Sequence, residues 1–328
     1  MSIGACTAHA PLTPADPAAA PPPDPVAEDT AGEQSGPPSR AGVPHTAERP
    51  EPRIDVVVSG TSAVYEGLVE ELETRLGNGR VFYLTADEPA QAKIFENVNE
   101  LGAEVVVTVG MRAARAAATY ADMPSVFCQV FNETAAELAG DDIRGVSSIP
   151  PLDQQLAIWR ELDPQLGSVG AILGDGSDRL LAEARSAARR GGLGFHGRRS
   201  HSDRETLYHF ERMLDAVDGF WLFPDNRILS PPVLEAIFSY AQQAGVQVAV
   251  FNPSLIAMGA DLGFTANDAD VAATALRVAA DIARGDGAGI PRITALSTVD
   301  VIVSRTDRHR LRISSARTEH PDVTLLVR

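Results

Sequence analysis

The stretch 218–260 constrains the fold most, because it contains a strand, a loop, a helix and a second strand in succession. Residues 219–223 are apolar or aromatic without polar alternation, which is typical of a parallel strand covered on both faces. Ser230 and the two prolines after it favour a helix start, and Gly245 favours its end before the apolar run 246–251. The stretch therefore predicts a parallel α/β unit.

Polar residues follow both strands of this unit. Asp225 and Asn226 come just after the first strand, and Asn252 comes just after the second. In an open α/β sheet, ligands bind outside the carboxyl ends of the strands. We therefore expect these three side chains to face one crevice, where the function of the protein resides.

The same alternation of short apolar runs and amphipathic segments fills the chain from residue 53 and restarts after Pro164. It predicts an α/β fold with two doubly wound parallel-sheet lobes joined by a hinge. The expected strands are 54–58, 81–84, 105–109, 125–130, 143–147, 169–173, one near Phe195, 219–223, 246–251, 296–303 and a short one at 323–327. The expected helices are 64–76, 91–101, 113–120, 152–162, 178–190, 205–216, one from Ser230 to Gly245, and 267–284.

These elements predict a domain division in which each lobe is made of two separate pieces of chain. Residues 53–146 with about 265–290 form lobe 1, and residues 147–264 with about 291–328 form lobe 2.

Residues 1–52 contain 12 of the 23 prolines and almost no large apolar side chains, so we expect a disordered tether. Within it, Cys6 follows Ile-Gly-Ala, which resembles the lipobox of bacterial lipoproteins and suggests lipidation at Cys6. The charged and apolar regions that normally precede a lipobox are missing, so either the chain begins at a late start codon or the match is chance.

The composition excludes several classes of partner. A net charge of −16, with Lys93 as the single lysine, argues against a nucleic-acid partner. No apolar run approaches the roughly 20 residues that span a bilayer, so we expect membrane attachment only through a lipid at Cys6. Cys128 lies in an apolar strand and is expected to be a buried, inert thiol.

The sequence contains no cofactor or catalytic motif in the structural context that the motif requires. Residues 192–197 match the dinucleotide pattern Gly-x-Gly-x-x-Gly, but a helix precedes them and a strand follows, which is the reverse of the required order. The sequence has no Gly-x-Ser-x-Gly and no histidine pair with metal-ligand spacing on a predicted helix. We therefore expect no cofactor, no metal and no enzymatic activity.

Five short motifs, in order, resemble type I periplasmic binding proteins, and in particular a branch of ABC-transporter substrate-binding proteins related to amino-acid-binding members. They are Val-Thr-Val-Gly-Met-Arg-Ala-Ala at 107–114, Pro-Ser-Val-Phe at 124–127, Gly-Val-Ser at 145–147, Phe-Pro-Asp-Asn at 223–226 and Leu-Gly-Phe at 262–264. The resemblance covers about residues 54–312. It implies a bacterial, extracytoplasmic and monomeric protein that binds a small solute and delivers it to an ABC permease.

Three positions depart from the pattern of that branch. Met111 stands where a small hydroxyl residue is usual, Phe131 and Asn132 replace an Asp-Pro type pair, and Arg144 precedes Gly145 where Thr is common. The ligand of the family therefore does not simply carry over, because the changes favour a more apolar ligand or a site that has lost its ligand.

Candidate ligand-binding residues follow from the needs of a zwitterion such as an amino acid. Helix starts and hydroxyl groups donate to a carboxylate, a carboxylate pairs with an ammonium, and aromatic rings stack on an apolar part. For Ser62 and Asp225 the alternatives are a helix cap and a turn residue, and Trp221 is expected in the core. The candidates are Ser62, Gly110, Met111, Phe131, Asn132, Ser147, Asp225, Asn226, Phe251 and Asn252.

Three functions remain open at this point. The first is solute capture for an ABC transporter. The second is a ligand sensor or structural envelope component of the same fold that has lost or changed its solute. The third is a doubly wound transferase, which needs a catalytic acid or base with a defined partner, and Asp225 alone does not supply both.

Overall fold

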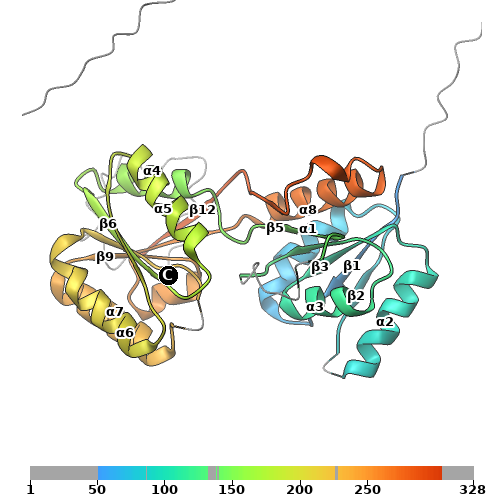
Figure 1. The fold of residues 1–328 in the computed structure, drawn as a ribbon, viewed down its shortest axis with the longest axis horizontal. Coiled ribbons are helices and arrows are strands. Elements are labelled where there is room, and N and C mark those ends of the chain that lie inside the picture. Colours follow the sequence, from blue (N-terminus) through green and yellow to red (C-terminus); the bar gives the residue numbers. More distant parts are fainter. Residues whose placement is uncertain (1–50, 86, 132–137, 139, 226–227, 305–328) are drawn as a thin grey trace, which may run out of the picture. The chain divides into compact units, whose positions relative to one another are not determined.

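The structure is a computed structural model that describes residues 51–85, 87–131, 138, 140–225 and 228–304. It contains two six-stranded sheets, each flanked by helices on both faces, and we call each sheet with its helices a lobe (Figure 1). The predicted α/β fold with two doubly wound sheets is confirmed. The predicted tether at 1–52 lies almost wholly outside the described residues, and Cys6 and the strand at 323–327 lie wholly outside them.

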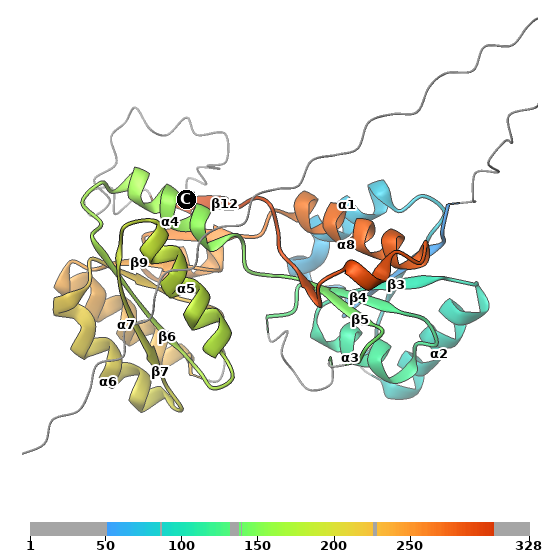
Figure 2. The same ribbon diagram turned by 45° about the horizontal axis from the view of Figure 1, so that its top comes forward.

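The first sheet is parallel throughout. Its order is β2 (Val81–Tyr83), β1 (Ile54–Val58), β3 (Val105–Val109), β4 (Ser125–Cys128), β5 (Ile143–Val146) and β11 (Ile293–Thr294). Helices α1 (Glu66–Arg75) and α8 (Asp268–Ala283) lie side by side on one face, and α2 (Glu88–Glu100) and α3 (Met111–Tyr120) cover the other (Figures 1 and 2). This double covering explains why β1 and β3 are buried at every residue.

The second sheet repeats this winding. Its order is β7 (Gly194–Arg199), β6 (Ser168–Leu173), β8 (Gly219–Trp221), β9 (Gln247–Val250), β10 (Leu262–Thr265) and β12 (Asp300–Val303). Helices α4 (Leu152–Leu162) and α5 (Asp178–Arg190) cover one face, and α6 (Asp203–Met213) and α7 (Pro231–Ala244) cover the other. Only β12 among the described strands of this sheet runs antiparallel, against β10. In both sheets the second strand of the chain lies at the edge, an order found in doubly wound folds.

The late strand predicted at 296–303 is shorter in the structure, where β12 forms the second half of that range and a separate short strand, β11, precedes it in the other sheet. β11 pairs with β5 in the first sheet, whereas β12 pairs with β10 in the second. Between them, the backbone N–H groups of Ser297 and Thr298 donate to the carboxylate of Asp270, which bends the chain away from a continuous strand. Consequently, residues 293–294, predicted in lobe 2, belong to the first sheet.

Other predicted boundaries move by a few residues for local reasons. β4 ends at Cys128 because Gln129 has a left-handed backbone with φ of 54°. α6 starts at Asp203 because the Ser202 hydroxyl caps it by accepting from Glu205 N. Short 3₁₀ helices lie next to α-helices or in the connecting loops. They are η1 (Ala63–Tyr65), η3 (Leu214–Ala216), η4 (Pro253–Met258) and η5 (Gly287–Gly289).

Cys128 is fully buried in β4, as predicted, and burial, with a smaller contribution from Asp268, raises the pKa of its thiol to about 12. Such a thiol carries almost no thiolate at neutral pH and is therefore unreactive. None of the helices in the described part of the chain combines the length and apolar character that crossing a membrane requires.

Candidate functional site

A cavity of about 930 Å³ is lined by residues of both lobes. Its walls are built mainly from segments that follow β3, β4, β5, β6, β8 and β9, so it lies at the carboxyl ends of parallel strands, where ligands bind in open α/β folds. The volume lies within the range of small-molecule sites, about 300 to 1,000 Å³. This cavity is the candidate ligand-binding site.

The first lobe contributes mostly apolar side chains to the wall. Met111 is the first residue of α3, and Phe131 follows β4. Val64 and Tyr65 come from η1, and Val64 is 73% exposed although it is apolar. An exposed apolar side chain at a cavity wall offers surface that a bound solute can cover.

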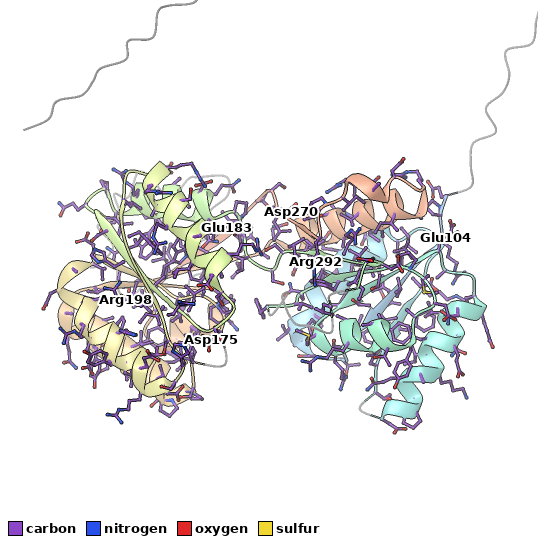
Figure 3. All side chains as sticks on the ribbon, viewed as in Figure 1. Glu104, Asp175, Glu183, Arg198, Asp270 and Arg292 are labelled. Carbon is purple, nitrogen blue, oxygen red and sulfur yellow. The ribbon has the colours of Figure 1, made fainter. Side chains whose placement is uncertain are left out.

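The second lobe contributes more charged groups. Arg179 and Glu183 lie one turn apart on α5 and form an ion pair of 2.7 Å between a guanidinium nitrogen and Oε1. Glu183 and Asp175, the latter in the loop before α5, are labelled on this lobe in Figure 3. Asp225 follows β8, and it is buried with an exposed fraction of 9%. The second lobe thus supplies both signs of charge.

Asp225 also holds the loop after β6. Its Oδ2 accepts a hydrogen bond of 2.9 Å from Gly174 N, and Gly176 and Ser177 of the same loop line the cavity. The carboxylate therefore lines the cavity and also holds the backbone of the loop after β6 in place. A substitution at Asp225 must keep this hydrogen bond if it is to test ligand contact alone.

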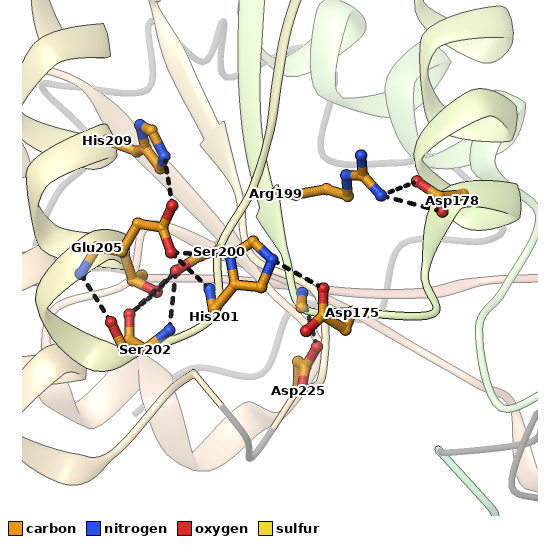
Figure 4. Close-up of polar contacts among 11 residues, drawn as sticks. Asp175, Asp178, Arg199, Ser200, His201, Ser202, Glu205, His209 and Asp225 are labelled. Atoms are coloured by element: carbon orange, nitrogen blue, oxygen red, sulfur yellow. Dashed lines mark hydrogen bonds and ion pairs between the residues drawn. The ribbon is translucent and has the colours of Figure 1, made fainter.

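A charged network also contacts the loop after β6 through Asp175 (Figure 4). His201 Nε2 lies 3.1 Å from Asp175 Oδ1, and His201 Nδ1 lies 3.0 Å from Glu205 Oε2. His209 Nε2 lies 3.4 Å from the other oxygen of Glu205. The hydrogen bond to Glu205, followed by the charges of Asp175 and Glu205, raises the pKa of His201, and Arg199 opposes this shift.

The two lobes also meet through one aromatic pair at the cavity. The rings of Phe131 and Phe251 have centroids 5.9 Å apart and planes inclined at 62°, an edge-to-face arrangement. Phe131 is 49% exposed, so much of its ring remains available to a ligand.

The structure brings together six of the ten residues predicted for ligand binding. Ser62 and Gly110 are not in the cavity wall: Ser62 is exposed and caps η1 by accepting from Val64 N at 3.4 Å. Asn132 and Asn226 lie outside the described residues. The six that line the cavity are Met111, Phe131, Ser147, Asp225, Phe251 and Asn252.

Gly110 is needed for a steric reason instead. Its φ is 85°, and a Cβ atom at this position would lie 2.5 Å from Tyr65 Oη and 2.7 Å from Ser59 Oγ. Only glycine leaves room for the Tyr65 phenol beside the start of α3.

Several polar residues of the wall are not among the predicted ligand-binding residues and lie outside the 218–260 unit. Arg115 and Arg179 lie near the starts of α3 and α5, and a charged side chain on a helix gives no signal in the sequence that it faces a ligand. Gln129 lies inside the apolar run predicted as strand 125–130, and no periodicity in the sequence reveals its left-handed backbone. Tyr65, Ser177 and Glu183 also line the wall.

No group of three or more His, Cys, Asp or Glu side chains among residues that the structure describes is arranged to hold a metal ion. The wall itself offers hydrogen-bonding groups, an ion pair and apolar surface.

Searches by sequence find no match to a protein-family model and none to a curated protein. Solved structures match the fold. One is the ABC domain in complex with L-Trp from Streptococcus pneumoniae, with a TM-score of 0.54, 19% identity, and coverage of 83% of this chain and 100% of that chain.

Two further matches have similar statistics. A conserved domain protein from Vibrio cholerae gives a TM-score of 0.55 at 18% identity, covering 85% of this chain and 100% of that one. The ligand-free, open structure of a substrate binding protein with adhesive properties from Clostridium difficile gives 0.60 at 16% identity, covering 83% and 98%. This protein therefore has the fold of the type I periplasmic binding proteins, as its sequence motifs predicted.

Proposed function

We propose that the protein is an extracytoplasmic solute-binding protein that captures a small solute, an amino acid or a related compound, between its two lobes. The observation that carries this proposal is the cavity at the carboxyl ends of strands from both sheets, with apolar walls and a few polar groups. Similar proteins of this fold are named as binding L-Trp or a substrate. Binding is the activity, and no catalytic step is proposed.

Delivery to an ABC permease and anchoring through a lipid at Cys6 belong to the same proposal. A tether of about 50 residues between an anchored cysteine and the lobes would let them reach a permease from the membrane surface. The sensor or structural role is the competing function, because Met111 and Phe131 make the first lobe more apolar than the motif of the resembled branch.

The test is a thermal-shift screen of residues 53–328 against the amino acids, small peptides, sugars and purine nucleosides. A solute present at 100 times its Kd stabilises the folded state by about 2.7 kcal/mol, which is a readily measured shift. Asp225→Asn is the variant of choice, because its side-chain oxygen still accepts from Gly174 N while its charge is removed. Asp215→Asn, in η3 and outside the cavity wall, is the matched control.

A shift that Asp225→Asn reduces and Asp215→Asn does not would support solute capture and identify the solute class. If no compound in the screen shifts the wild-type protein, the proposal of amino-acid capture fails and the sensor or structural role takes its place.

A further inference from the structure

Most polar groups in the wall of the cavity already have partners within the protein. Ser147 Oγ donates to Ile149 O and accepts from Ile149 N, both at 3.2 Å. Asn252 Oδ1 accepts from Ser254 N at 2.9 Å. Together with Asp225 and the pair Arg179–Glu183, these groups are partly occupied before any solute arrives.

Two wall residues of the first lobe differ from these. The Tyr65 hydroxyl and the Gln129 carboxamide make no hydrogen bond to another residue of the described chain, and both side chains are half-buried in the wall. The remaining polar side chain on this side, Arg115, is exposed and has an interaction of its own. A hydroxyl and an amide left without a protein partner at a cavity wall are groups that a ligand can satisfy.

Gln129 has a backbone conformation that costs stability, and the space that Tyr65 occupies depends on a glycine. Gln129 is the one non-glycine residue with positive φ in the described part of the chain, and a left-handed backbone is unfavourable for glutamine by about 1 kcal/mol or more. The Tyr65 hydroxyl packs against Gly110 in space that any side chain there would fill. Such local costs concentrate at ligand sites, because the surrounding structure holds the residue for a purpose other than stability.

We propose that Tyr65 and Gln129 contact the solute directly and select for an uncharged hydrogen-bonding group, such as a hydroxyl or a carboxamide, on the part of the solute that faces the first lobe. A phenol and a carboxamide both donate and accept without carrying charge, so they match a group that does the same. Met111 and Phe131 surround them with apolar wall, where an uncharged polar group costs less to bury than an ion.

This inference rests on the proposed function, and its test uses the same solute screen with two pairs of compounds compared directly. L-tyrosine against L-phenylalanine, and L-glutamine against L-methionine, differ mainly in one uncharged polar group. We expect the polar member of a pair to bind more tightly to the wild-type protein. Tyr65→Phe and Gln129→Gly then weaken the Kd of the best solute by about 3- to 10-fold each, as expected for one neutral hydrogen bond.

The controls separate contact with the solute from a structural role. Gln129→Gly relieves the left-handed backbone, so the melting temperature of the ligand-free variant stays equal to or rises above that of the wild type while affinity falls. Tyr208→Phe on α6 and Gln243→Ala on α7 remove the same groups from exposed side chains outside the cavity wall, and they leave affinity unchanged.

Three results would overturn the inference. Unchanged affinity in both Tyr65→Phe and Gln129→Gly, with a solute that binds the wild type, removes the inference and leaves the proposed function standing. Equal affinity for both members of each pair has the same effect. A silent screen removes the proposed function and this inference together.

Discussion

The indole Nε1 of Trp221 donates to Oε1 of Gln155 at 2.9 Å, and Gln155 Nε2 donates in turn to Pro150 O at 2.8 Å. Gln155 is 3% exposed and Trp221 is 2% exposed, so both hydrogen bonds are shielded from water. Pro150 lines the cavity and lies where the chain passes from β5 to α4. One buried amide thus fixes this connection between the lobes to the end of β8.

Replacing Gln155 with alanine leaves a buried indole N–H and a buried carbonyl without their partners. We expect the free energy of unfolding to fall by about 2 to 4 kcal/mol, since each buried group left unsatisfied costs about 1 to 3 kcal/mol and part of the cost is relieved by water. Denaturant unfolding followed by tryptophan fluorescence measures the change. The same substitution at the exposed Gln243 should change stability by less than about 0.5 kcal/mol, and an equal loss at both sites would refute the role of Gln155.

Asp270 stabilises the connection between β11 and β12 at the start of α8, where it is labelled in Figure 3. Its carboxylate accepts from Ser297 N at 2.7 Å and Thr298 N at 2.9 Å, and also from both hydroxyl groups. Burial raises the pKa of Asp270, but these hydrogen bonds outweigh it and hold the pKa below the ordinary value of 3.8.

Because the pKa of Asp270 is lower in the folded state, its stabilising effect is fully present above pH 3.8 and is lost as the pH falls through the lower folded value. We expect Asp270→Asn to reduce the free energy of unfolding by about 1.5 to 3 kcal/mol at pH 7. The difference from wild type should shrink below pH 3.8. Asp281→Asn, which alters only surface ion pairs on α8, should cost less than about 1 kcal/mol.

Asp268, two residues earlier in the chain, has the opposite behaviour. Burial, followed by the charges of Asp300 and Glu71, raises the pKa of its carboxyl above 3.8. Its ionisation is therefore harder in the folded state, and stability decreases as the pH rises from 3.8 through the folded pKa. We expect Asp268→Asn to increase the free energy of unfolding at pH 7 by up to about 1 kcal/mol, because the site is only partly shielded from solvent.

Thermal unfolding of Asp268→Asn at pH 7 and at pH 3 checks this expectation. The gain should be present at pH 7 and absent at pH 3, where the wild-type carboxyl is protonated in both states. A loss of stability at pH 7 would mean that the favourable interaction of Asp268 with the start of α8 exceeds its burial cost.

His201 is expected to titrate above 6.5, because Glu205 and Asp175 favour its charged form. The pairing stabilises the folded protein below the unfolded value of about 6.5, and this contribution disappears as the pH rises through the higher folded pKa. An NMR titration of the His201 ring measures the pKa directly. Glu205→Gln should lower it, whereas Glu211→Gln, also on α6, should leave it unchanged; a pKa at or below 6.5 in the wild type contradicts the geometry.

Much of the fold was predictable because the buried strands consist of uninterrupted apolar runs. The stretch around Phe220 and Val248 carries its strand pattern in the residues themselves, and the glycine at 245 adopts the left-handed cap that ends α7. The separation of β11 from β12 was not predictable, because it depends on hydrogen bonds from Ser297 and Thr298 to Asp270, 27 and 28 residues away in the sequence.

The site was predictable to the extent that it follows the ends of strands. Asp225, Phe251 and Asn252 line the cavity because they come immediately after strands in a parallel sheet. Tyr65 and Gln129 were not predicted. The Tyr65 hydroxyl lies beside Gly110, 45 residues away in the sequence, and Gln129 has a left-handed backbone inside an apolar run. Both depend on tertiary geometry that a single sequence does not encode locally.

The passage of the chain from β10 in the second sheet to α8 and β11 in the first has a consequence for biosynthesis. The ribosome completes β6 to β10 before α8 exists, so the face of β1 and β3 that α8 later covers stays exposed while the second lobe is being made. Val271 and Val278 then bury that face at a late stage of synthesis. The first lobe therefore cannot finish folding before the second lobe has been synthesised, and the second sheet waits for β12. The nascent protein presents apolar surface to chaperones until nearly the whole described chain has emerged.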